Sequence, residues 1–165
     1  MTLDSFTESV LIDNTSATIE GTWVLQDYKY WYEHADGTFT KDAWENIDSK
    51  WYLFDAQGYM IYDCKKDGGN WYYLGASDDG SMKTGWCYDK TSCKWYYFNA
   101  DGVMQTEWIE LDSKWYYLNA SGAMCTGWIV VDSKDYCLYS DGAMIFNTTA
   151  YGYSFASDGV STKLS

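Results

Sequence analysis

The sequence contains no proline, a single histidine, His34, and only 11 lysine and arginine residues against 24 aspartates and glutamates. One histidine leaves almost nothing for a zinc amidase or a histidine-dependent hydrolase to work with. The formal net charge of −13 would be repelled by a nucleic-acid backbone, so we expect no DNA or RNA partner. No apolar run approaches the roughly 18 residues that span a bilayer, so we expect no membrane span.

A signal peptide is also missing at the N-terminus. The segment Met1–Ser5 is acidic and lacks the basic and apolar regions of such a leader. We therefore expect either a piece of a larger protein or a chain that is not exported by that route. Residues 1–20 fall outside the periodicity described next and are expected to be a linker or a cap.

Aromatic residues are abundant, because 10 Trp, 17 Tyr and 6 Phe make up 20% of the chain. Most of them follow an internal repeat with a period of about 20 residues. The first tryptophan of each unit falls at Trp23, Trp44, Trp86, Trp108 and Trp128, with Cys64 in the same slot. The second falls at Trp31, Trp51, Trp71, Trp95 and Trp115, with Asp135 in the same slot.

A third slot holds a glycine, and a fourth lies two residues further on. The glycines are Gly37, Gly58, Gly80, Gly102, Gly122 and Gly142. The residues that follow them are Phe39, Met60, Met82, Met104, Met124 and Met144. Within a unit, β-forming residues flank a polar turn such as Asp112-Ser113-Lys114, which predicts a two-stranded hairpin. An isolated hairpin is marginal in water, so each unit must bury a face on its neighbours.

The sequence therefore predicts an all-β solenoid, a superhelix of about six β-hairpin repeats of roughly 20 residues. We place the repeats in residues 21–159 and expect 160–165 to be a tail. No segment shows helical periodicity over ten or more residues.

Two segments carry a resemblance to a known family. The stretches GW…KWYYFNADGVM (Gly85–Met104) and EW…KWYYLNASGAM (Glu107–Met124) resemble the choline-binding, or cell-wall-binding, repeat of Gram-positive surface proteins, autolysins and phage endolysins. The resemblance implies a left-handed superhelix that binds phosphocholine on teichoic acid at the bacterial cell wall. It also implies a non-catalytic anchoring module, with no cofactor, beside a separate catalytic domain. A chain without a signal peptide would then be a piece of such a protein or a phage-encoded module.

Choline is a cation without an N–H group, so it offers no hydrogen bond. The negative faces of aromatic rings attract it by about 0.5–2 kcal/mol per contact. By resemblance, each cage takes both tryptophans of one unit, a tyrosine of the next and a methionine. The four expected cages are Trp44, Trp51, Met60 and Tyr72; Trp86, Trp95, Met104 and Tyr116; Trp108, Trp115, Met124 and Tyr136; and Trp23, Trp31 and Tyr52 with Phe39 in the methionine slot.

Two junctions depart from this pattern. Cys64 leaves Trp71, Met82 and Tyr96 with an open wall, and Asp135 removes the second tryptophan after Trp128. We therefore expect about four working sites from six units.

Other interpretations stay open. Glucan-type repeats also carry GW and YYF motifs, and a self-associating structural repeat would pack its cages on themselves. The C-terminal hairpin is the candidate surface for a homodimer. The five cysteines either pair as Cys87–Cys93 and Cys125–Cys137 or stay reduced as small apolar residues. Their spacing does not fit a zinc site, and His34, in a polar turn, is expected to be solvated.

Overall fold

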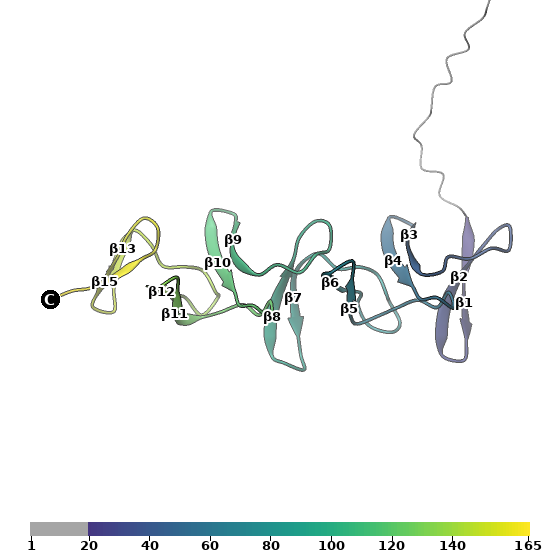
Figure 1. Cartoon of the computed structure of the whole chain (residues 1–165), viewed down its shortest axis with the longest axis horizontal. Coiled ribbons are helices and arrows are strands. Elements are labelled where there is room, and N and C mark those ends of the chain that lie inside the picture. The colour runs from purple at the N-terminus through teal and green to yellow at the C-terminus, as the bar shows by residue number, and fades with distance from the viewer. Residues whose placement is uncertain (1–19) are drawn as a thin grey trace, which may run out of the picture.

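The computed structural model describes residues 20–165, which form an elongated rod of short antiparallel hairpins (Figure 1). This confirms the all-β hairpin repeat. Residues 1–19 of the expected linker lie outside the described residues. Within residues 20–165 there is no helix, and so none that is long and apolar enough to cross a membrane.

Seven hairpins follow one another along the rod, and we number them in chain order. Their strands are β1 (Gly21–Gln26) and β2 (Lys29–His34), β3 (Ala43–Ile47) and β4 (Lys50–Phe54), β5 (Cys64–Asp67) and β6 (Asn70–Tyr73), β7 (Gly85–Asp89) and β8 (Lys94–Phe98), β9 (Glu107–Leu111) and β10 (Lys114–Leu118), β11 (Gly127–Val131) and β12 (Lys134–Leu138), and β13 (Thr148–Ala150) and β14 (Tyr153–Phe155). We call the contact between hairpins 1 and 2 the first junction, and number the others likewise.

Most hairpins close through a two-residue turn in which both residues have a positive φ. Asp48 and Ser49 have φ values of 50° and 64°, and Gly68 and Gly69 have values of 52° and 89°. This is the type I′ turn, whose twist matches that of the flanking strands. The polar turns of the sequence therefore set the hairpin register.

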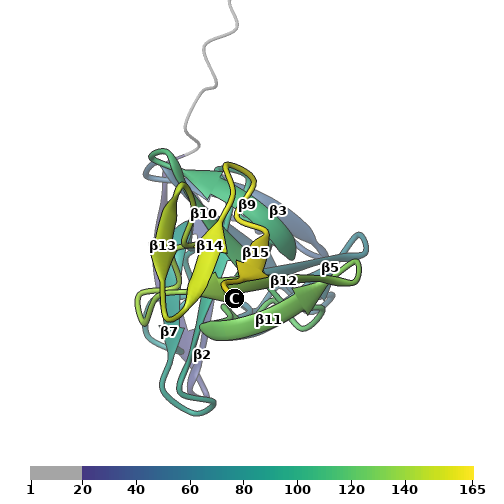
Figure 2. The same ribbon diagram turned by 90° about the vertical axis from the view of Figure 1, so that its left-hand side faces the viewer.

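Successive hairpins point in different directions around the rod. Seen along its length, β2 and β7 lie on one side, β3 and β9 on a second, and β5 and β11 on a third (Figure 2). Hairpins three apart therefore share a direction. One backbone hydrogen bond at each of the first five junctions helps to fix this rotation. Met82 N donates to Trp51 O at 2.8 Å, and Met124 N donates to Trp95 O at 2.8 Å.

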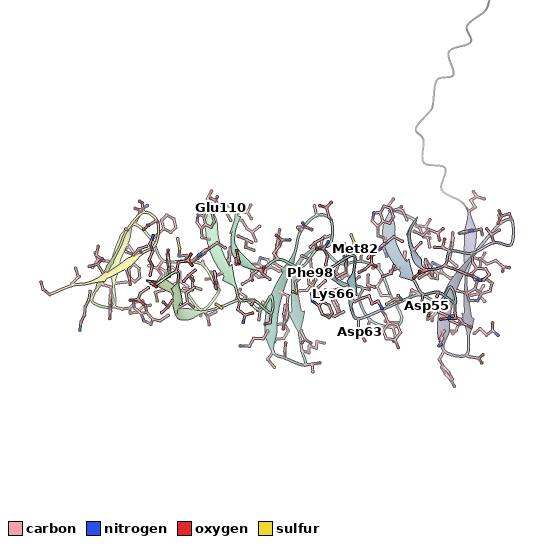
Figure 3. The ribbon with its side chains drawn as sticks, viewed as in Figure 1. Asp55, Asp63, Lys66, Met82, Phe98 and Glu110 are labelled. Carbon is pink, nitrogen blue, oxygen red and sulfur yellow. The ribbon has the colours of Figure 1, made fainter. Side chains whose placement is uncertain are left out.

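The axis of the rod is filled by one residue of each hairpin after the first, which lies in its second strand or, in hairpin 3, directly after it. These side chains are at most 3% exposed: Phe54, Leu74, Phe98, Leu118, Leu138 and Phe155. Burial of each is worth about 1.5–3 kcal/mol. Figure 3 shows Phe98 and Met82 near the axis, whereas Glu110 lies at the outer end of its hairpin.

A second column consists of methionines that pack under glycines. The side chain of Met104 lies under Gly122, so that a Cβ there would stand 2.5 Å from Met104 Sδ. The same contact joins Met60 to Gly80 and Met124 to Gly142. The paired glycine and methionine slots are therefore a packing device of the superhelix. We call these residues the column glycines and column methionines.

The C-terminal end differs from the expectation. Residues 160–165 are not merely a tail, because β15 (Ser161–Lys163) pairs with β14 in a three-stranded sheet. The repeat thus ends in a three-stranded sheet, in which β15 is the third strand.

His34 also differs from the expectation, because it is buried and not solvated. Its exposed fraction is 8%. Its Nε2 lies 2.8 Å from Glu45 Oε1, and its Nδ1 lies 2.8 Å from Thr38 Oγ1. The ring joins the end of β2 to β3, and the other oxygen of Glu45, Oε2, is buried without a hydrogen-bond partner. The polar residues next to His34 predicted an exposed turn, and they gave no sign of the contact with Glu45, which is 11 residues further along the chain.

Replacing His34 by alanine should lower the free energy of unfolding by about 1–3 kcal/mol, because the buried Glu45 carboxylate then loses its only side-chain donor among the described residues. Urea denaturation followed by circular dichroism measures the change as a lower midpoint. Glu33→Ala is the matched control, since Glu33 is an exposed neighbour. Equal midpoints for the two variants would contradict the prediction.

Candidate binding site

A cavity of about 320 Å³ lies at the fourth junction, between hairpins 4 and 5. Its walls come from these two hairpins and from the loops after hairpins 5 and 6: Trp86, Trp95, Tyr116, Met124, Ser140 and Asp141. No single hairpin supplies all of the walls. The cavity therefore exists only because the units stack.

The two tryptophans of this cavity are held differently. The Trp86 ring is half-buried, with its centroid 5.2 Å from that of Tyr97 and 5.1 Å from that of Tyr116, both edge to face. Such pairs fix the orientation of a ring. Trp95 is 43% exposed and stands at the mouth. One indole is thus locked by the fold, and the other presents its surface to solvent.

The same arrangement recurs at the second and fifth junctions. The ring centroids of Trp44 and Tyr72 are 4.9 Å apart, and those of Trp108 and Tyr136 are 5.0 Å apart. The second tryptophans, Trp51 and Trp115, are again exposed. Regularly spaced exposed indoles mark an interaction surface rather than a core.

The methionine of each expected cage is wrong by one unit. The structure places Met124, not Met104, with Trp86 and Trp95. The backbone bond explains the difference, because Met104 N donates to Trp71 O and Met124 N to Trp95 O. By the same bonds, Met82 replaces Met60 at the second junction, and Met144 replaces Met124 at the fifth.

The expected grouping of Trp23, Trp31, Tyr52 and Phe39 is wrong in one respect. Trp23 does lie against Tyr52, but Trp31 is on the other face of the hairpin. Trp23 lies opposite Tyr32 in the hairpin, and Trp31 lies opposite Val24 on the other face. Trp31 packs instead on Phe39, with ring centroids 5.0 Å apart. Tyr30 takes the slot of the second tryptophan, and Met60 N donates to its carbonyl at 2.7 Å.

The rings of the first junction fill much of its interior. Tyr52 is 7% exposed, and its centroid lies 4.8 Å from that of Trp23. Burial, with the nearby carboxylates of Asp79 and Asp48, raises the pKa of the Tyr52 phenol, so this tyrosine stays neutral. Trp23 and Tyr52 are therefore packed like core residues. A cavity of about 290 Å³ lies at the same junction, with Tyr30 and Met60 among its walls.

The third and sixth junctions lack one indole each. At the third, the exposed Trp71 has Cys64 in the partner slot. At the sixth, Trp128 stacks against Tyr153 and Phe155, with centroids 4.7 Å and 5.9 Å away. The complete set of two indoles, a phenol and a thioether is thus found at the second, fourth and fifth junctions of the described chain.

Sequence reasoning missed Ser140 and Asp141, which line the fourth cavity. Both residues belong to the loop after hairpin 6, whereas Trp86 and Trp95 belong to hairpin 4. The spacing of residues within one unit therefore does not predict their place in the cavity. A signal was present nonetheless, because the residue before the column glycine is acidic in most units.

The five cysteines are free thiols in the structure. Neither expected pair lies opposite in a hairpin, because Cys87 pairs with Tyr96 and Cys137 with Trp128. Burial raises the pKa of the Cys137 thiol, as expected for a small apolar packing residue. Within residues 20–165 no cluster of three or more His, Cys, Asp or Glu side chains could hold a metal ion.

The fold is a module of stacked hairpin repeats, with a cavity between hairpins 4 and 5. The choline-binding repeat model matches residues 40–86 and 84–126. No curated protein sequence matches the chain significantly.

Solved structures give a longer match. Choline binding protein F from Streptococcus pneumoniae is 40% identical with a TM-score of 0.79, over 86% of this chain and 47% of that one. CbpJ from the same species is 37% identical with a TM-score of 0.80, over 87% and 48%. The modular Cpl-1 endolysin, complexed with a peptidoglycan analogue, is 32% identical with a TM-score of 0.54, over 80% and 40%.

The chain belongs to the choline-binding repeat family. Domains of this family are non-catalytic binding modules of cell-surface and cell-wall proteins, and lysins carry them beside separate catalytic domains. The chain spans about half the length of choline binding protein F and CbpJ.

Proposed function

We propose that this chain binds the choline groups of teichoic acid and anchors a larger bacterial or phage-encoded protein to the cell wall. The fourth cavity carries the proposal, because it joins two indoles, a phenol and a thioether at one point. A quaternary ammonium needs faces of this kind and no hydrogen-bond acceptor. A sugar would need several polar side chains that point toward its hydroxyl groups. Apart from the polar atoms of the aromatic residues, only Ser140 and Asp141 supply polar side chains to this cavity.

Three cages are proposed, at the second, fourth and fifth junctions. The net charge of −13 favours the approach of a cation over the Debye length of about 8–10 Å. A teichoic acid carries many choline groups, so several cages on one rod act together. The overall affinity of several linked sites exceeds the affinity of a single cage, without any new contact within a cage.

The test is a titration of the full chain with choline in the millimolar range, read by calorimetry and intrinsic fluorescence. We expect three choline molecules per chain from the three complete junctions, quenching of Trp emission, and a higher melting temperature through ligand linkage. Trp95→Ala should remove one of these sites and leave the fold intact at the other junctions.

The chain offers a matched control in Trp71→Ala. Trp71 is 44% exposed and Trp95 is 43% exposed, and both stand in the second tryptophan slot. Only the hairpin of Trp95 has an indole in the first tryptophan slot, Trp86, because Cys64 stands in that slot in the hairpin of Trp71. Equal loss of choline in the two variants would count against the cages. A melting curve that shifts with dextran and ignores choline would favour a glucan-binding module.

Self-association through the C-terminal hairpin stays a prediction. Hairpin 6 and the end of the rod expose Trp128, Val130 and Tyr151, with exposed fractions of 48%, 70% and 71%. Exposed apolar side chains of this size are consistent with a contact surface.

A further inference from the structure

The residue before the column glycine follows a rule across the junctions. The loop after hairpin 6 supplies Asp141 to the fourth cavity, so each junction receives this residue from the loop two hairpins beyond its first hairpin. The residues for the first to fifth junctions are then Asp79, Asp101, Ser121, Asp141 and Asp158. Of these five junctions, only the third receives no carboxylate, and it also lacks an indole.

Asp141 is available to a ligand in the cavity. Its Oδ1 accepts a hydrogen bond from the Ala143 backbone N–H at 3.0 Å, which fixes the side chain in the loop. Its Oδ2 lies 4.0 Å from Lys114 Nζ, and the two side chains are 62% and 57% exposed. An exposed pair at this distance is weak and is screened by salt.

The first junction shows the opposite case. The Asp79 carboxylate is held by both the Lys83 ammonium and the Ser81 hydroxyl. Its charge is therefore already neutralised by its own loop. The carboxylate of the first junction is thus bound closely within its own loop, whereas Asp141 at the fourth has only an exposed lysine 4.0 Å away.

We infer that Asp141 is the charged wall of the fourth cage, and that it makes the cage select a cation over a neutral molecule of the same shape. The inference rests on the proposed function. The indoles, the phenol and the thioether cover methyl groups, and they would cover those of a tert-butyl group too. Charge selection beyond the ring quadrupoles needs a full negative charge at the rim.

The rule extends to the other complete cages. Asp101 stands in this position for the second junction and Asp158 for the fifth. Asp158 Oδ1 accepts a hydrogen bond from Val160 N at 3.1 Å, as Asp141 does from Ala143. The loops of the fourth and fifth junctions thus hold their carboxylates by the same backbone hydrogen bond.

The test isolates the fourth cage in the full chain. The parent variant is Trp51→Ala with Trp115→Ala, which removes an exposed indole from each of the other two cages. Asp141→Asn is then added. Asparagine keeps the acceptor for Ala143 N and removes only the charge, so the loop is retained. Calorimetry measures binding of choline and of 3,3-dimethylbutan-1-ol, its uncharged isostere.

We expect Asp141→Asn to weaken choline binding about three- to five-fold in dilute buffer, less at high salt, and to leave the alcohol unaffected. Asp132→Asn is the matched control, because it removes the same charge from the turn of hairpin 6. Equal weakening by the two variants, equal effects on both ligands, or no effect would each overturn the inference. A parent that binds no choline would instead overturn the proposed function.

Discussion

Replacing Gly122 by alanine is expected to lower the free energy of unfolding by about 2–5 kcal/mol, a large loss for a single methyl group. Two costs add. The φ of Gly122 is +81°, in the left-handed region, and an added Cβ would stand 2.5 Å from Met104 Sδ and 2.7 Å from Met104 Cε. The column methionine must then leave its place under the glycine. Urea denaturation followed by circular dichroism measures the loss.

Gly127→Ala separates the two costs. Gly127 has a φ of +73°, but no atom lies within 4 Å of a Cβ built there. The equivalent residue of hairpin 5, Glu107, adopts a φ of 66° with a full side chain. The control should therefore cost only the backbone part, about 1–2 kcal/mol. If both alanines cost the same, the column of methionines and glycines does not stabilise the superhelix.

The sequence was sufficient to predict the hairpins because their signals are local. The Asp-Ser and Gly-Gly turns, the flanking β-forming residues and the period of about 20 residues all lie within one unit. In hairpins 2, 4 and 5 the first and second tryptophans also lie on the same face by local pairing alone. Trp86 and Trp95, for example, lie in paired strands of one hairpin.

The error at Trp31 was avoidable from spacing. Trp44 and Trp51 are seven residues apart, and a two-residue turn places residues at odd separations on the same face. Trp23 and Trp31 are eight apart around the turn Asp27-Tyr28, so they must face opposite sides. The even separation was visible in the sequence.

The methionine register could not be obtained in this way. Which methionine meets which indole depends on the rotation between hairpins, and no residue pattern within a unit encodes that rotation. The bond from Met124 N to Trp95 O spans 29 residues. The same holds for Asp141, which reaches the cage of Trp86 from two hairpins further along. Cages shared between units need the superhelix before their members can be named.

A cage can be added if the walls are correctly assigned. The third junction already has an exposed indole in Trp71, and Met104 N donates to the Trp71 carbonyl at 2.8 Å, as in the complete cages. It lacks the first indole, because Cys64 stands in that slot, paired with Tyr73. Cys64 is exposed, so a larger side chain there displaces no core residue.

Cys64→Trp is therefore expected to raise the choline stoichiometry from three to four per chain, measured by calorimetry on the full chain. Adding Ser121→Asp should tighten the new site, because it supplies the carboxylate found at the complete junctions. Cys93→Trp is the control, since Cys93 is an exposed residue of the turn in hairpin 4. A folded Cys64→Trp chain that still binds three choline molecules would show that two indoles, a phenol and a thioether are not enough to make a site.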